Sequence, residues 1–198
     1  MTPVCVRTYI GGMRWDALFD DMEAQLASRD LLDLESEVAE RWRADIAGVD
    51  LADRLRGSMG LRVGAHLTAD LVFEGTLSHV GGESLVLNDG PHQVLIPFEA
   101  VARYQGLGRL AVAEPSNVRR KLGLASALRG LARDRAHLRV FLRFQGGGEA
   151  ALSGVIDRVG RDHFDLAVTH PGEARRASDV SRTATVPFGR LAALKSLR

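Results

Sequence analysis

The side chains best suited to chemistry are arginines, and they gather in the middle of the chain. Between residues 119 and 143, eight cations are opposed by one acid, Asp134. The cations are Arg119, Arg120, Lys121, Arg129, Arg133, Arg135, Arg139 and Arg143. A guanidinium group is a planar fork of donors that suits phosphate oxygens. The cluster therefore predicts contacts to a nucleic-acid backbone, and further arginines would extend that surface, namely Arg158, Arg161, Arg175, Arg176 and Arg182.

Short motifs typical of enzymes are absent from the sequence. It contains no G-x-S-x-G, no H-E-x-x-H, no phosphate-binding P-loop and no C-x-x-C. None of the 6 histidines is spaced from another histidine or from the cysteine as metal ligands usually are. We therefore predict a non-enzymatic binding protein with neither metal nor cofactor.

The composition is typical of a globular protein. Of the 198 residues, 45% are hydrophobic and 26% are charged. We expect no membrane contact, because the sequence lacks an apolar run of about 18 residues and a signal-peptide pattern. Cys5 is the only cysteine, which excludes an internal disulfide framework and is typical of a reducing cytoplasm. The predicted location is cytoplasmic.

The charge is divided unevenly along the chain. Residues 14–56 contain 12 acids and 6 bases, whereas residues 57–198 contain 13 acids and 19 bases. Such asymmetry can indicate an anionic partner for the basic part. The arginines could equally neutralise the acidic segment, within one chain or between copies. The sequence leaves both interpretations open.

The acidic segment has the apolar period of a helix. We expect a loose tail over residues 1–13 and a helical segment over residues 14–57. Apolar side chains recur about every 3.6 residues in two runs, which are Trp15, Leu18, Phe19, Met22 and Leu26, and then Leu31, Leu34, Val38, Trp42 and Ile46. Ser28 or Asp30 could cap a second helix, so the segment is either two antiparallel helices or one long bent helix. Its apolar stripes would be covered by the core of the chain or by a partner protein.

The remainder of the chain contains one strand pattern written twice. Residues 75–87, GTLSHVGGESLVL, match residues 154–166, GVIDRVGRDHFDL, at a shift of 79 positions. HLTADLVF and HLRVFLRF match at a shift of 71, and LIPF and TVPF at a shift of 90. The order of the matches is kept while the turns vary in length, as expected for a repeated fold.

Each copy has room for about five short strands. A sheet that small must curl to bury one face, and a closed barrel limits its exposed edges. We therefore predict an α+β fold with two tandem SH3-like β-barrels, at residues 61–106 and 137–198. A basic and partly helical connector, residues 107–136, would join them.

The repeated skeleton G-x-h-x-x-h-G-x-x-x-h-x-h followed by h-P-F-x-x-h, where h is apolar, resembles the Sm-like family, which includes bacterial Hfq. The resemblance implies a strongly bent five-stranded sheet in each copy, assembly through barrel edges and RNA binding. The stretch MRWDALFDDMEAQL, residues 13–26, resembles a group of actinobacterial proteins, some of them labelled transcriptional regulators. That likeness implies a bacterial cytoplasmic protein, and only the label adds the expectation of a regulatory role.

We therefore predict a nucleic-acid-binding protein that contacts phosphates through the connector and the second barrel, with RNA favoured over DNA. We also expect a homo-oligomer formed through barrel edges. The alternative is a protein-interaction scaffold that docks a partner through its N-terminal helices and barrel edges.

Overall fold

A computed structural model describes residues 15–67, 71–143, 149–169 and 182–197. The predicted tail, residues 1–13, and the arginines at 175 and 176 lie outside these ranges. The chain divides into two compact units, residues 1–48 and residues 49–198. In the described ranges, no helix is long and apolar enough to cross a membrane.

The described part of the first unit is one continuous helix, α1 (Trp15–Ala47). Its sequence contains neither glycine nor proline, so nothing breaks the backbone hydrogen-bond ladder. Ser28 does not cap a second helix, because its hydroxyl donates to Ala24 O at 2.8 Å within the same helix. Of the two arrangements left open by the sequence, the long helix is observed, but it ends at Ala47, and the rest of the predicted segment contains the separate short helix α2 (Leu51–Arg56).

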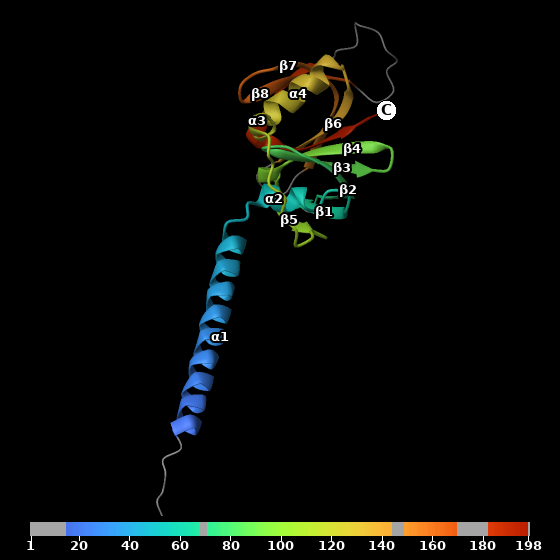
Figure 1. The fold of residues 1–198 in the computed structure, drawn as a ribbon. Coiled ribbons are helices and arrows are strands. Elements are labelled where there is room, and N and C mark those ends of the chain that lie inside the picture. Colours follow the sequence, from blue (N-terminus) through green and yellow to red (C-terminus); the bar gives the residue numbers. More distant parts are fainter. Residues whose placement is uncertain (1–14, 68–70, 144–148, 170–181, 198) are drawn as a thin grey trace, which may run out of the picture. The chain divides into compact units, whose positions relative to one another are not determined.

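The second unit contains short helices and ten strands (Figure 1). In chain order, its elements are α2 (Leu51–Arg56), β1 (Arg62–Leu67), β2 (Val72–Val80), β3 (Ser84–Asp89), β4 (His92–Pro97), the 3-10 turn η1 (Phe98–Ala100), β5 (Val101–Gln105), α3 (Asn117–Lys121), α4 (Leu124–Arg133), β6 (His137–Arg143), β7 (Glu149–Val159), β8 (His163–Val168), β9 (Arg182–Pro187), the 3-10 turn η2 (Phe188–Arg190) and β10 (Leu191–Ser196).

The prediction of two closed barrels is wrong. The strands form a single antiparallel open sheet in the order β5-β1-β2-β3-β4-β10-β6-β7-β8-β9. A closed first barrel would require β4 to return to β5, but β4 pairs with β10 from the other half. Each half therefore uses an edge strand to join the other half instead of closing on itself.

The two halves repeat the same strand order and the same local irregularities. β5-β1-β2-β3-β4 corresponds to β10-β6-β7-β8-β9. The β2–β3 ladder shifts register between Leu77 and His79, and the β7–β8 ladder shifts at Ile156 and Arg158, which are 79 positions later. The turns also match, because Gly81 N donates to Ser84 O at 2.8 Å and Gly160 N donates to His163 O at 2.9 Å.

The second unit has two hydrophobic cores, and each contains residues from both halves. Leu77, Leu87 and Ile96 of the first half share a core with Phe141, Ala192 and Ala193 of the second half. The rings of Phe73 and Phe141 meet edge to face, with centroids 5.2 Å apart. In the other direction, Leu95 packs against the core built on Leu138, Phe164 and Leu166. The halves are therefore interdependent.

Polar contacts reinforce the short β4–β10 ladder. Leu95 pairs with Leu194, and Val94 pairs with Lys195. His92 Nδ1 donates to Ser196 O at 2.9 Å, and the backbone N–H of Gln93 donates to Ser196 Oγ at 2.8 Å. Lys195 Nζ also donates to Asp89 Oδ2 at 2.8 Å, at the end of β3. Because the ladder is short, these contacts carry much of the polar pairing between the halves.

The repeated glycines are required by close strand approach. A Cβ on Gly154 would lie 2.1 Å from Ala167 O, and one on Gly75 would lie 2.5 Å from Asn88 O.

We predict that Gly154→Ala lowers the free energy of unfolding by about 2–4 kcal/mol, because the strands must separate. Gly130→Ala is the matched control. Gly130 lies in α4 with open space around its Cβ position, so that variant should gain up to about 1 kcal/mol. Equal stabilities of the two variants in urea denaturation would contradict this.

The Asp89–Lys195 pair should make stability depend on pH in the acid range. The hydrogen bond from Lys195, and then its charge, hold the pKa of Asp89 below its usual value. The pair thus stabilises the fold above the unfolded-state pKa and loses this effect as pH falls through the folded-state pKa. Asp89→Asn should cost about 0.5 kcal/mol near neutral pH, since the pair is partly exposed. The difference from wild type should vanish in acid, whereas a difference that is independent of pH would contradict the assignment.

Candidate nucleic-acid interface

Helix α4 carries the centre of the basic region, and both halves of the second unit hold it in place. Leu124 and Leu128 are buried in the second core, with Leu131 and Ala132 packed beside them. Figure 1 shows the helix (yellow) beside β7. Its opposite face is polar, so the helix is strongly amphipathic.

The N-terminus of α4 is held by a residue of the first half. Glu83, in the β2–β3 turn, accepts a hydrogen bond from the Leu124 amide at 2.7 Å. The residue at the helix N-cap, Gly123, has no side chain to do this. A Cβ on Gly123 would lie 2.5 Å from Glu83 Oε2, so the glycine leaves room for the carboxylate. The negative charge of the carboxylate also interacts favourably with the positive end of the helix dipole.

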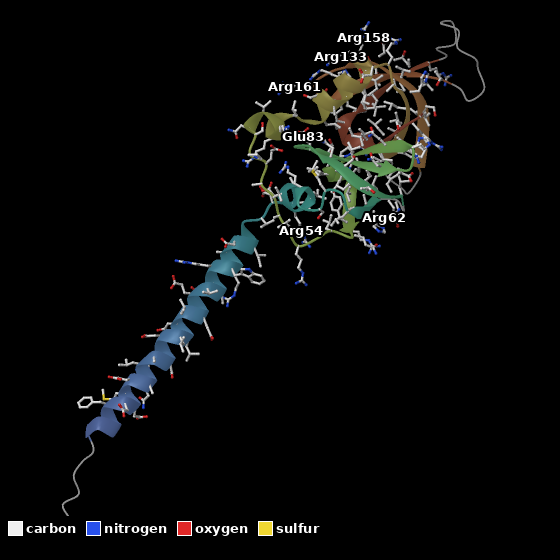
Figure 2. The ribbon with its side chains drawn as sticks, turned by 45° about the vertical axis from the view of Figure 1, so that its right-hand side comes forward. Arg54, Arg62, Glu83, Arg133, Arg158 and Arg161 are labelled. Atoms are coloured by element: carbon white, nitrogen blue, oxygen red, sulfur yellow. The ribbon has the colours of Figure 1, made fainter. Side chains whose placement is uncertain are left out.

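Four exposed arginines lie on α4 and on the neighbouring β7–β8 hairpin. Arg129 and Arg133 are one helical turn apart on α4, and Arg129 Nη2 makes a long hydrogen bond of 3.4 Å to Gly160 O in the hairpin turn. Arg158 and Arg161 are exposed on the hairpin itself. Figure 2 shows Arg133, Arg158 and Arg161 on one side of the second unit, away from Arg62. We call Arg129, Arg133, Arg158 and Arg161 the α4–hairpin surface.

Acids near this surface reduce its net charge without cancelling it. Arg158 Nε is 3.8 Å from Asp157 Oδ2, but 82% of the Arg158 side chain remains exposed. Asp162 is paired with His163 at 2.8 Å, and the hydrogen bond from that imidazole lowers the pKa of Asp162. Asp134 follows α4 directly. Four exposed arginines therefore lie near three aspartates, which leaves a small excess of positive charge on this surface.

The other predicted site residues lie outside the α4–hairpin surface. Arg119 and Arg120 are exposed on α3, and Arg120 lines a small polar cavity of about 240 Å³ with Asp50, Asp53, Arg56 and Gly82. Lys121 is the last residue of α3, but its side chain is not among those that the structure describes.

Two further predicted residues lie beyond α4. Arg135 is exposed just after the helix, with a φ of 45°. Arg139 is exposed on β6, and its guanidinium carbon is 5.4 Å from the centre of the Phe141 ring.

Arg143 shows that one residue of the predicted cluster is structural. Its guanidinium donates to Glu99 O at 2.7 Å and to Gly189 O at 2.6 Å, so it ties η1 to η2. It also lies 3.5 Å from the Glu99 carboxylate. Only 20% of the side chain is exposed. Sequence reasoning missed this role and that of Glu83, because both depend on contacts between the halves.

Aromatic side chains of the second unit are withdrawn from the surface in the ranges described. Each is buried or half-buried, namely Phe73, Phe98, Tyr104, Phe141, Phe164 and Phe188. Bases of single strands usually stack on exposed aromatic rings. The described surface thus offers guanidinium groups without a stacking platform.

Comparison with known proteins finds no matching family model and no significant match among curated proteins. Among the described residues, no group of three or more His, Cys, Asp or Glu side chains is arranged to hold a metal ion. The geometry of the α4–hairpin surface is therefore the main guide to function.

The cap on α4 gives a direct test of how this surface is positioned. Glu83→Ala should lower the free energy of unfolding by about 1 kcal/mol, because the Leu124 amide loses its acceptor. Glu74→Ala is the control, since among the described residues the Glu74 carboxylate makes an exposed pair with Arg62. Thermal unfolding that is equal for the two variants would show that Glu83 does not anchor the helix.

Proposed function

We propose that this protein binds nucleic acid by contacting phosphates through the α4–hairpin surface. The observation that carries the proposal is the gathering of four exposed arginines from two separate elements on one side of the second unit. Arginine forks bind phosphate oxygens in two-point contacts. The exposed arginines of α3 would form a second, smaller contact region.

The same geometry supports recognition of the backbone over recognition of bases. Phosphate contacts position a protein on nucleic acid but do not read its sequence. Because the described aromatic rings of the second unit are buried or half-buried, we expect little contribution from base stacking there. Binding should thus depend weakly on sequence and strongly on salt.

RNA is the first candidate partner, because the Sm-like resemblance of the sequence implies it, and DNA is the second. We place the protein in the bacterial cytoplasm as a regulator that acts by binding and not by catalysis. The single cysteine supports a reducing compartment.

Paired arginine variants test the proposal. Arg133→Ala/Arg158→Ala should weaken binding to a generic RNA duplex and a DNA duplex at least about tenfold at low salt. The slope of log affinity against log salt should also fall by about 0.9 for each lost phosphate contact. Arg62→Ala/Arg103→Ala removes the same charge on β1 and β5 and is the matched control. It should change affinity less than about twofold.

Fluorescence anisotropy over a series of salt concentrations measures all of these quantities. Absence of binding at low salt would contradict the proposal outright. Equal losses in the two double variants would show that net charge, and not the α4–hairpin surface, is responsible.

A further inference from the structure

We infer that the C-terminal half of α1 is a docking surface for a basic amphipathic helix of another protein. The inference concerns the first unit alone and is independent of the proposed nucleic-acid binding. It depends on three properties of α1, which are its two apolar stripes, their exposure and its charge.

The apolar side chains of α1 form two stripes that face different directions. Leu18, Met22 and Leu26 recur every four residues in the N-terminal half. The second stripe contains Leu31, Leu34, Val38, Trp42 and Ile46. At 100° per residue, the two stripes point about 180° apart, so they lie on opposite faces of the helix. They cannot form one continuous coiled-coil seam, which needs a single face along the whole helix.

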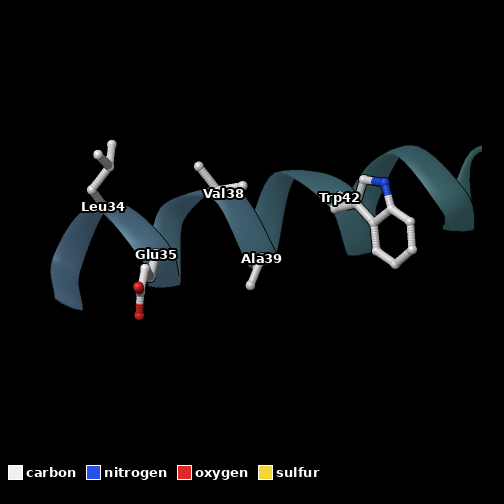
Figure 3. Close-up of a pocket in the computed structure, with 5 residues that line it drawn as sticks. All are labelled: Leu34, Glu35, Val38, Ala39 and Trp42. Atoms are coloured by element: carbon white, nitrogen blue, oxygen red, sulfur yellow. The ribbon is translucent and has the colours of Figure 1, made fainter. Parts of the chain in front are cut away.

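Within the first unit, the second stripe is exposed along its whole length. The exposed fractions are 63% for Leu31, 56% for Leu34, 59% for Val38, 67% for Trp42 and 55% for Ile46. A shallow hollow of about 350 Å³ lies on this part of the helix. Figure 3 shows its lining residues, Leu34, Glu35, Val38, Ala39 and Trp42. Contiguous exposed apolar surface of this kind marks an interaction site.

The charge of α1 decides between kinds of partner. The helix contains ten acids and three bases, a net charge of −7. One of the bases, Arg41, is paired with Glu37 at 3.0 Å. Two copies of α1 lying side by side would bring two strongly negative helices together, which is unfavourable. A helix with lysines and arginines beside its apolar stripe would instead be attracted.

The dimensions of the stripe define the partner further. The stripe from Leu31 to Ile46 is about 23 Å long at 1.5 Å per residue. A partner helix of about 16–20 residues would cover it. Its apolar residues would recur at i, i+3, i+4 and i+7. Trp42, the largest exposed side chain of the stripe, is the expected anchor.

The test uses the full chain and a labelled synthetic peptide of 18 residues, with leucines at that spacing and lysines elsewhere. A second peptide has the same composition but a scrambled order, so it keeps the charge and loses the stripe. We expect the first peptide to bind at least about tenfold more tightly than the second. Val38→Ser/Trp42→Ser should remove at least about nine tenths of that affinity.

Leu18→Ser/Met22→Ser is the matched control, because it removes two apolar residues from the other stripe of the same helix. It should change the affinity less than about twofold. Equal binding of both peptides would reduce the effect to charge attraction and overturn the inference. So would absence of binding, equal losses in the two variants, or self-association of the free chain that Val38→Ser/Trp42→Ser abolishes, since the occupant would then be a second copy. Circular dichroism confirms that both variants keep the helix.

Discussion

The pairing of β4 with β10 is the interaction on which the second unit depends. It joins two copies of the same five-stranded order into one sheet. The ladder is short, but side chains cross it in both directions, because Phe141 enters the first core and Leu95 packs on the second. Removing one half would therefore expose apolar surface of the other half, and the hydrophobic effect opposes this.

The same dependence extends to the basic surface. Helix α4 covers the second core, yet the carboxylate that satisfies its first amide comes from Glu83 in the first half. Arg143 likewise ties η1 of the first half to η2 of the second. The arginines of α4 and the hairpin are thus held on a scaffold to which both halves contribute, and such rigidity suits the proposed phosphate binding.

The sequence predicted what is local. The period of apolar residues indicated the helix at the N-terminus, and the glycines at positions 81 and 160 marked matching turns. The partner of each sheet edge could not be predicted, because a strand pattern specifies which face is buried but not which edge is paired. Charge composition likewise indicated the basic region, but Arg143 and Arg133 differ only in where the fold puts them. Arg143 is structural because β6 puts its guanidinium between η1 and η2, whereas Arg133 lies on the exposed face of α4.

Native-state hydrogen exchange of the β4 and β10 amides tests most directly whether the halves act as one body. If the single sheet is the cooperative unit, the amides that bond Leu95 to Leu194 should exchange only through global unfolding, with the same free energy as the amides at the centres of β2 and β7. Exchange at the β4–β10 boundary with a much lower free energy, while both halves stay protected, would show two independent modules and contradict the account.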